Sequence, residues 1–389
     1  MEYRFADCVL GHARRTLTRG GDPVSLEPQV FDLIALLVSN PDRAIPRDEL
    51  VDVVWGGRIV SDSAISARIA SARKAVSDDG KRQEVIRTVA RVGLQMATPV
   101  EDQGAEPPQA RAATLAAPSI RYTKNVHGHA LAYTVSGKGP PVLRSYLGSH
   151  LEGEWNAVRP KAVFDLLQEK NALLRVDYVG AGMSSRDAHL RDFNDAAEDL
   201  RIAVDAAGLD RLSLFSESGG VHAALRFAVR YPDRVEKMII VGGYVHGRSH
   251  RAWSPQGDFL KNMIGESWSD GKSSVVRALC LAYYPDGPMD EVYETAEVIF
   301  NAFDVEPHQA ARDAINSVSN VDLLGQIRIP TLIVHGRHDA IHPLSEAQKL
   351  ATGIANAELV VLDTANHLPF PGHPTWPKFA SVVRNFLDK

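Results

Sequence analysis

Short apolar runs recur between about residues 140 and 362 and alternate with longer amphipathic segments. A parallel sheet needs this alternation, because a helix must return the chain to the edge where the next strand begins. Two such helices are predicted over 194–207 and 220–231. We therefore expect a mostly parallel sheet covered on both faces, with strand cores at 142–143, 172–176, 212–215, 238–241, 331–334 and 359–362.

The chain has 389 residues, which is too long for one ordinary core, and its composition changes near residue 100. Segment 101–118 is rich in Pro, Ala and charge and has no apolar period, as a linker does. The sequence therefore predicts a multidomain protein, with one domain over 1–100 and a second over 119–389. The stretch from about 247 to 328 breaks the strand–helix alternation, and we expect a helical cap there.

The bulk composition is that of a soluble globular protein, with 44% hydrophobic and 23% charged residues. Cys8 and Cys280 lie far apart, so we expect two buried thiols in a reducing compartment. No apolar run approaches the ~18 residues that span a bilayer. The first residues also lack the order of a signal peptide. We expect a cytoplasmic protein with no membrane partner.

The first hundred residues predict short strands, three helices and a hairpin. Pro28 fits the first turn of one helix, a second runs from about Arg47 to Val54, and Ser61 caps a third over 62–76. The hairpin is predicted over 85–97. On the third helix, the side chains that lie off the apolar stripe and are expected to face outward are Arg68, Arg73 and Lys74.

The net charge of -5 gives no general attraction to nucleic acid, so DNA contact needs a local basic face. Segment 58–91 supplies one, with eight basic residues against four acidic ones. A basic helix followed by a hairpin fits major-groove insertion with a wing on the DNA backbone. Charge alone favours the simpler interpretation, a solvated arginine surface.

The sequence motifs of the first hundred residues favour DNA binding more strongly than the charge does. Residues 1–98 resemble the OmpR/PhoB-type winged-helix DNA-binding domain at 26–33, 47–50, 54–56, 68, 73–74 and 86–89. The resemblance implies that 62–76 is the recognition helix, that 85–97 is the wing, and that a homodimer binds double-stranded DNA. The wing departs from the family, because Arg-Val-Gly-Leu at 91–94 replaces Gly-x-Gly-Tyr. The DNA contacts expected are Arg58, Arg68, Arg73, Lys74, Arg87 and Arg91.

Ser218 lies in the string Ser-Glu-Ser-Gly-Gly, between a predicted strand and a predicted helix. A nucleophile at such a corner needs small neighbours, because the turn is strained and the helix passes close by. The string alone also fits an ordinary turn. However, Asp339 and His367 each follow a later strand, in the chain order of a Ser-Asp-His triad. In that role His367 takes the serine proton, and Asp339 orients the imidazole and stabilises its charge.

These residues, with 177–184 and 231–235, make 119–389 resemble the α/β-hydrolase superfamily. We therefore expect a winged helix-turn-helix (α+β) domain followed by an α/β-hydrolase fold with a helical cap. The amides of Gly219 and Leu147 are the expected oxyanion hole, although 144–148 replaces the family's usual His-Gly. Segment 149–155 resembles a subgroup in which such hydrolases are fused to regulatory domains.

Four neighbouring residues, His335, His338, Asp339 and His342, raise the alternative of a zinc site. On a strand-to-loop segment this spacing does not place the side chains on one face. Closed zinc sites need several converging ligands. We therefore expect no metal and no cofactor.

Two functions of different class remain open. In the first, the chain is a one-component transcriptional regulator whose hydrolase domain binds, and hydrolyses, a small ester, lactone or amide. In the second, it is chiefly a serine hydrolase with an accessory DNA-binding domain, or a catalytically silent ligand receptor. A sensor needs no nucleophile, so the presence of all three triad residues favours some turnover, and we expect the first function, a regulator with hydrolase activity.

Overall fold

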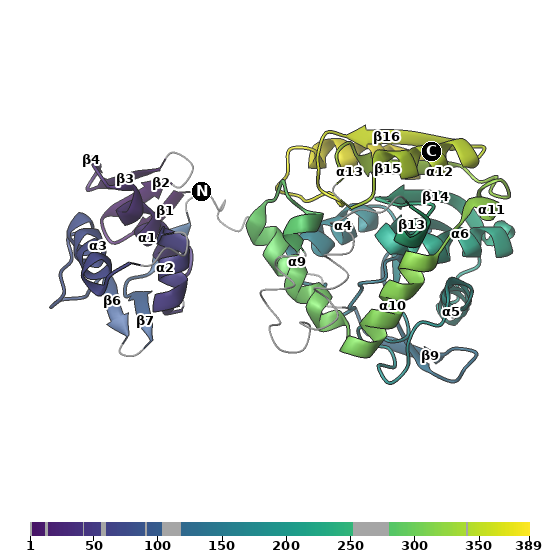
Figure 1. The fold of residues 1–389 in the computed structure, drawn as a ribbon, viewed down its shortest axis with the longest axis horizontal. Helices are drawn as coiled ribbons and strands as arrows, with labels where there is room; N and C mark the ends of the chain where they lie inside the picture. The colour runs from purple at the N-terminus through teal and green to yellow at the C-terminus, as the bar shows by residue number, and fades with distance from the viewer. Residues whose placement is uncertain are drawn as a thin grey trace. The chain divides into compact units, whose positions relative to one another are not determined.

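The computed structural model divides into two compact units, Met1–Thr114 and Leu115–Lys389 (Figure 1). The structure describes residues 2–11, 15–41, 43–55, 60–89, 92–102, 118–251, 280–339 and 341–389.

An antiparallel sheet, three helices and a smaller sheet make up the N-terminal unit. The larger sheet has the order β4-β3-β2-β1-β8, with β1 (Glu2–Phe5), β2 (Cys8–Gly11), β3 (Thr16–Arg19), β4 (Asp22–Val24) and β8 (Val100–Asp102). The helices are α1 (Pro28–Val38), α2 (Arg47–Trp55) and α3 (Asp62–Ala75). The smaller sheet has the order β5-β7-β6, with β5 (Ile45–Pro46), β6 (Ile86–Val89) and β7 (Gly93–Met96).

The helices form where the sequence predicts them, for local reasons. Pro28 lies in the first turn of α1, where its missing N–H has no helical partner to lose. The side chain of Ser61 accepts a hydrogen bond from the Ala64 amide at 3.3 Å and so caps α3. The apolar faces of α1 and α3 then share one core with the larger sheet, which includes Phe5, Leu10, Phe31, Ile34, Leu37, Ile65 and Ala72.

Strands β6 and β7 form the hairpin predicted over 85–97, with Ile86 opposite Met96 and Val89 opposite Gly93. Strand β7 also pairs with β5, which brings the two backbones close together. A Cβ atom at Gly93 would lie 1.8 Å from the Ile45 carbonyl oxygen, so only glycine fits there.

The N-terminal sheet extends into the predicted linker. Strand β8 pairs with β1, Tyr3 lying opposite Asp102, so backbone pairing continues two residues beyond the predicted domain end at residue 100. Linker composition did not predict this strand, because Glu and Asp are poor strand formers. The remaining linker positions, 103–117, lie outside the described residues.

An eight-stranded sheet forms the centre of the C-terminal unit. Its order is β16-β15-β14-β13-β11-β12-β10-β9, and β11 to β16 form five consecutive parallel pairs, while β10 and β9 are antiparallel. The chain order changes direction around β11, which places a binding crevice at the carboxyl ends of the strands. The bounds are β9 (Arg121–Lys124), β10 (Ala130–Gly137), β11 (Pro141–Ser145), β12 (Ala172–Val176), β13 (Leu212–Glu217), β14 (Val235–Val241), β15 (Thr331–Gly336) and β16 (Ala357–Leu362).

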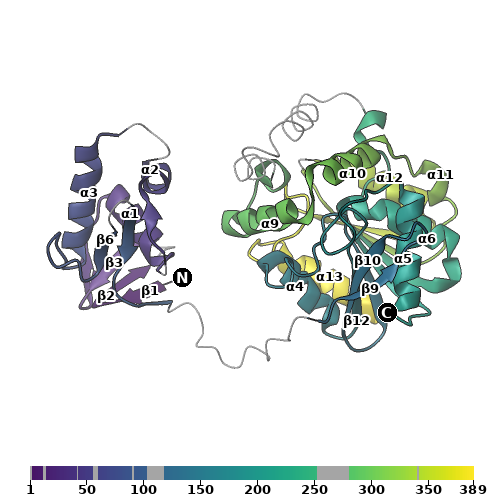
Figure 2. The same cartoon turned by 90° about the horizontal axis from the view of Figure 1, so that it is seen from below.

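Helices cover both faces of this sheet, as a buried parallel sheet requires (Figure 2). One core joins the sheet to α5 (Phe193–Ala206), α6 (Val221–Arg230) and α12 (Leu344–Gly353). The other joins it to α4 (Val158–Gln168) and α13 (Trp376–Asp388). Adjacent strand residues alternate between the two cores, as Leu214 and Phe215 do. Two short 3₁₀ turns, η1 (Ser218–Gly220) and η2 (Pro232–Arg234), precede and follow α6.

Within the predicted cap, the described residues are mainly helical. They form η3 (Arg248–His250), α9 (Met289–Ala302), α10 (Val305–Ser317) and α11 (Val321–Leu324). The Gly182 amide donates to the Ala302 carbonyl at 2.7 Å, which fixes the end of α9 to the loop after β12. Residues 252–279, which belong to the same prediction, lie outside the described residues.

Both cysteines are free and buried, Cys8 in the first unit and Cys280 in the second. The helices in the described part of the chain include none that is long and apolar enough to cross a membrane.

The close approach at Gly93 predicts a stability defect. We expect Gly93→Ala to lower the free energy of unfolding by about 1–3 kcal/mol, because the new methyl group overlaps the backbone of β5. Denaturant unfolding followed by circular dichroism measures this. Gly80→Ala is the matched control, since its Cβ would lie 3.8 Å from the nearest atom. Equal midpoints for Gly93→Ala and the wild type would contradict the packing described.

Candidate active site and DNA-binding surface

Ser218, Asp339 and His367 lie just after β13, β15 and β16, and the structure brings their side chains together. His367 Nε2 is 2.8 Å from Ser218 Oγ, and His367 Nδ1 is 2.7 Å from Asp339 Oδ2. Because a carboxylate only accepts hydrogen bonds, Nδ1–H donates to Asp339, and Nε2 accepts from the serine hydroxyl. This is the arrangement in which imidazole can remove the serine proton.

Asp339 is held in place by its own loop. Its Oδ1 accepts hydrogen bonds from the amides of Ile341 and His342 at 2.8 and 2.9 Å, and the residue is 8% exposed. Burial alone would raise the pKa of Asp339, but the facing His367 and the hydrogen bonds outweigh it and lower the pKa. Asp339 therefore stays ionised, as the orienting carboxylate must.

The backbone at Ser218 adopts a φ of 51°, a conformation that costs a non-glycine residue about 1–3 kcal/mol. Its neighbours explain how the chain holds this turn. A Cβ at Gly220 would lie 2.1 Å from the Ser145 carbonyl oxygen, so glycine lets η1 pass close to β11. Ser216, two residues before Ser218, donates through its Oγ to the Ile239 carbonyl at 3.2 Å. Its polar side chain is therefore satisfied inside the sheet.

Ser218 opens onto a cavity of about 110 Å³ between the sheet and the cap helices α9 and α10. Leu147 and Gly219, the predicted oxyanion-hole residues, both line it. Their position beside Ser218 fits the predicted oxyanion hole, which stays a prediction. The other lining residues are Tyr146, Gly148, Cys280, Tyr283, Tyr284, Ile299, Phe303, His308, Ala311, Arg312, Ile315, His367 and Leu368.

The sequence did not identify the polar residues that α10 contributes to this cavity, His308 and Arg312. The sequence does contain a pattern that could have identified them. The i, i+3, i+4, i+7 spacing of one helix face is followed by residues 308, 311, 312 and 315. A histidine and an arginine on an otherwise apolar face are unusual, and that combination marks the cavity side of α10.

The histidine group considered for zinc does not converge as a whole, because His338 is exposed. His335 and His342 are buried; the His335 ring donates through Nε2 to the His342 carbonyl at 2.9 Å and lies 3.4 Å from Asp339 Oδ2. Among the described residues, no group of three or more His, Cys, Asp or Glu side chains is arranged to hold a metal ion.

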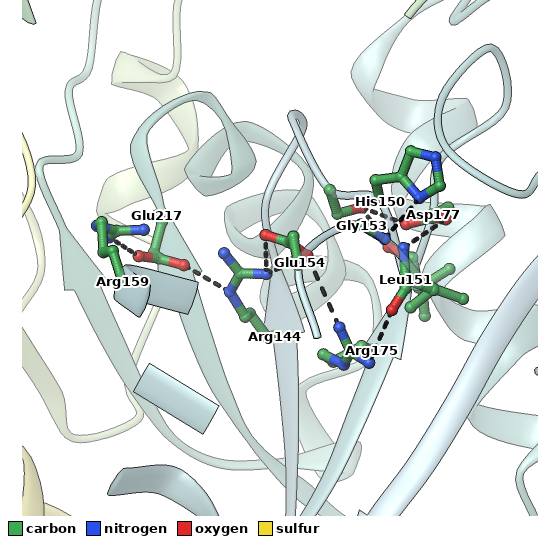
Figure 3. Close-up of polar contacts among 11 residues, drawn as sticks. Arg144, His150, Leu151, Gly153, Glu154, Arg159, Arg175, Asp177 and Glu217 are labelled. Carbon is green, nitrogen blue, oxygen red and sulfur yellow. Dashed lines mark hydrogen bonds and ion pairs between the residues drawn. The ribbon is translucent and has the colours of Figure 1, made fainter. Parts of the chain in front are cut away.

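A buried ionic network lies directly behind Ser218 (Figure 3). Glu217, the residue before the serine, accepts from Arg144 Nε at 2.6 Å and from Arg159 Nη2. Glu154 accepts from Arg144 Nη1 at 2.9 and 3.0 Å and lies 3.8 Å from Arg175. Each of the five side chains is about 1% exposed or less.

Arg159 connects the two loops that carry the serine and the histidine. Besides Glu217, it donates through Nε to the carbonyl of Pro369 at 3.1 Å, two residues after His367. Burial raises the pKa of Glu217, but Arg144 and Arg159 outweigh it and bring the pKa down to about 2. Glu217 is therefore an ionised anchor for the nucleophile turn.

Segment 149–155, which the sequence resemblance linked to fused hydrolases, supports this network. The Ser149 hydroxyl donates to Asp177 Oδ1 at 2.8 Å, and the Leu151 amide donates to Oδ2 at 3.0 Å. Figure 3 shows Leu151 beside Asp177 and Glu154 between the arginines. In the described structure, this segment therefore holds Asp177 and Arg144 in place.

On the predicted DNA-binding surface, the basic residues fall into different environments. Lys74 on α3 and Arg87 on β6 are exposed, and the Arg87 guanidinium donates to Gln95 Oε1 at 2.7 Å. Arg58 and Arg91 lie outside the described residues. Lys74 and Arg87 are thus the predicted contacts that the structure leaves accessible.

The prediction that Arg73 faces outward is wrong. It is 8% exposed, and its guanidinium donates to the Ile86 carbonyl at 3.0 Å and to Thr88 Oγ1 at 2.9 Å. Arg73 follows Ile69 by one helical turn, at the edge of the apolar stripe, and therefore ties α3 to β6. Arg68 is half-buried. Its guanidinium donates to Gln29 Oε1 on α1 and forms an ion pair with Glu27, the residue just before α1.

The ionic anchor predicts a pH-dependent stability loss for Glu217→Gln. Its folded pKa of about 2 lies below the ordinary 4.5, so the charge stabilises the fold above pH 4.5 and this contribution falls as pH drops toward 2. We expect a loss of about 3–5 kcal/mol at pH 7, because two buried guanidiniums lose a partner, and a smaller loss at pH 3. Denaturant unfolding at both pH values measures it.

Glu169→Gln is the control for this experiment. That residue forms an ion pair with Arg384, and both side chains are 45% exposed, so its loss should cost less than about 1 kcal/mol. Two outcomes would contradict the role of Glu217 as an ionised anchor. One is a loss of unfolding free energy in Glu217→Gln as small as that in Glu169→Gln, and the other is an equal loss at pH 7 and pH 3.

Two parts of the chain match known families. Residues 21–96 match the family described as transcriptional regulatory protein, C terminal. Residues 157–371, more than half of the chain, match the family described as serine aminopeptidase, S33.

Curated relatives match the second unit over most of their length. The chain is 26% identical over 269 residues to a pyrrolizixenacetamide deacetylase from Xenorhabdus hominickii, covering 66% of this chain and 94% of the relative. It is 26% identical over 262 residues to a 2-hydroxymuconate semialdehyde hydrolase from a Pseudomonas species, covering 65% and 88%.

Solved structures show the same fold. An esterase from Exiguobacterium antarcticum superposes with a TM-score of 0.58 at 21% identity, covering 69% of this chain and 99% of the esterase. The enol-lactonase from Burkholderia xenovorans gives a TM-score of 0.57 at 21% identity, covering 69% and 100%. With the winged-helix unit before it, the chain combines a DNA-binding domain with a serine hydrolase-like domain. It belongs to the serine aminopeptidase, S33 family of α/β-hydrolases.

Proposed function

We propose that this chain is a one-component transcriptional regulator whose α/β-hydrolase domain binds and hydrolyses a small ester, lactone or amide. The observation that carries the proposal is the hydrogen-bond chain from Ser218 through His367 to Asp339, at the wall of a cavity. The winged-helix domain on the same chain supports the regulatory half.

In the proposed reaction, Ser218 Oγ attacks the carbonyl carbon while His367 Nε2 takes the hydroxyl proton. The amides of Gly219 and Leu147 stabilise the negative charge on the oxygen. His367 then gives its proton to the leaving alcohol or amine. A water molecule hydrolyses the acyl-enzyme by the same steps and releases the acid, while Asp339 stabilises the imidazolium throughout.

The relatives support this reaction class. Their names describe a deacetylase and a semialdehyde hydrolase, and the similar folds include an esterase and an enol-lactonase. All of these names concern acyl or carbonyl substrates, which a serine nucleophile attacks.

For the regulatory half, we propose that two copies bind double-stranded DNA, with α3 in the major groove and the β6–β7 hairpin as the wing. The two copies can adopt an arrangement that binds DNA and one that does not. A ligand that binds more tightly to one of these arrangements regulates transcription. Hydrolysis would then remove the ligand and end the signal.

The nucleophile assignment predicts that Ser218→Ala lowers kcat/KM for short-chain 4-nitrophenyl esters by roughly 10⁴–10⁶-fold, because no hydroxyl remains to attack. Release of 4-nitrophenol measures it. Ser216→Ala is the matched control: this serine is two residues away and bonds only the sheet, so activity should stay within about tenfold. Comparable activity in wild type and Ser218→Ala would refute the nucleophile.

The DNA-binding surface predicts that Lys74→Ala and Arg87→Ala each weaken binding to a duplex, because each removes one exposed cation. The slope of log Kd against log salt should fall by about 1 for each DNA phosphate that the variant no longer neutralises. Fluorescence anisotropy with a labelled random-sequence duplex measures both quantities. Arg4→Ala, an exposed cation on β1, is the control and should change neither. An unchanged salt slope in both test variants would count against this surface.

A further inference from the structure

One wall of the cavity beside Ser218 carries a cation. Arg312, on α10, lines the same cavity as the serine and His367. Its Nη1 donates to the hydroxyl oxygen of Tyr283 at 3.3 Å. The Tyr283 ring contacts the His367 ring edge-on, with centroids 5.6 Å apart, and its carbonyl accepts from the His367 amide at 2.9 Å. A single side chain therefore separates this guanidinium from the imidazole.

A second cation lies next to α10. Arg248 belongs to η3, which is tied to the end of α10 because His250 Nε2 bonds the Ser317 carbonyl at 2.8 Å. Its Nη1 is buried and has no hydrogen-bond partner among the residues that the structure describes. Burial raises the pKa of the Tyr283 hydroxyl, but Arg312 and Arg248 outweigh burial and lower it, so both guanidiniums act on the same group.

No carboxylate in the described part of the chain forms an ion pair with Arg312 or Arg248. The two carboxylates whose charges act on Arg251, three residues after Arg248, have other partners: Asp339 binds His367, and Glu346 binds Lys349 at 2.7 Å. Both arginines are half-buried, and a partly desolvated cation with no anion is unfavourable, so a negatively charged ligand would stabilise this wall.

The size and shape of the site narrow the ligand class. The cavity of about 110 Å³ is below the roughly 300–1,000 Å³ of sites for drug-sized ligands, so it suits a short acyl group. A guanidinium presents paired N–H donors whose geometry matches a carboxylate. The Tyr283 hydroxyl accepts from Arg312, which leaves its own hydrogen to donate to the same anion.

We infer that the substrate carries a free carboxylate, bound by Arg312 with Tyr283 and supported by the charge of Arg248, while its scissile carbonyl lies at Ser218. The inference rests on the proposed hydrolase function and names its substrate class: a short ester, lactone or amide that is also an acid, such as the half ester of a short dicarboxylic acid. Water cleaves the acyl bond, and the products are a dicarboxylate, an alcohol and a proton.

The first test compares two esters of equal acyl length, mono-4-nitrophenyl succinate and 4-nitrophenyl butyrate. We expect the wild type to have at least about tenfold higher kcat/KM for the succinate. Arg312→Gln should lower the succinate-to-butyrate ratio about 10- to 100-fold, as loss of a charge-assisted hydrogen bond does, and Arg312→Lys should restore part of it. Arg211→Gln, whose exposed side chain lies just before β13, should leave the wild-type ratio unchanged.

The second test measures binding without turnover, by calorimetry with monomethyl succinate and the full-length Ser218→Ala variant. Adding Arg312→Gln should weaken binding at least about tenfold. If the succinate-to-butyrate ratio of kcat/KM is near one in the wild type and Arg312→Gln does not change it, the carboxylate inference is overturned. The hydrolase proposal would remain intact in that case. Binding that depends on Arg312 in a chain that hydrolyses neither ester would support the inference while the catalytic proposal fails.

Discussion

The backbone turn at Ser218 is the constraint on which the rest of the hydrolase domain depends. Its φ of 51° is unfavourable for serine, yet this conformation brings the hydroxyl to 2.8 Å from His367. The sheet holds the turn from one side, because Gly220 lets the following helix contact β11. The ionic network holds it from the other, since Glu217 is fixed by Arg144 and Arg159.

Buried ion pairs are rarely the cheapest way to stabilise a fold, because both charges lose their hydration. Here they also position groups that are far apart in sequence. Arg159 bonds both Glu217 and the Pro369 carbonyl, so one side chain sets the spacing between the serine loop and the histidine loop. The same domain has guanidiniums on the opposite, cap side of the cavity, where no protein carboxylate of the described residues pairs with them. Arginines thus support the reacting groups on one side and select a ligand on the other.

The sequence predicted the parts of the structure that local rules determine. The helix that begins at Pro28 and the helix capped by Ser61 formed as expected. Ser218, Asp339 and His367 lie together because parallel strands place their carboxyl ends at one edge of the sheet. The sequence failed where long-range packing decides. Arg73 lies beside the apolar stripe of α3, and it becomes an interior residue because β6 supplies the Ile86 carbonyl and the Thr88 hydroxyl as acceptors. Arg312 and Ser218 line one cavity because of the way the cap lies over the sheet, and helical spacing alone does not determine that arrangement.

Fluorophosphonate labelling followed by peptide mass spectrometry measures whether Ser218 is a nucleophile activated by His367. We expect one adduct per chain, on the peptide containing residue 218, and its loss in a His367→Ala variant. Full-length protein that acquires no adduct, or acquires it elsewhere while residue 218 stays unmodified, would show that Ser218 is not the activated nucleophile.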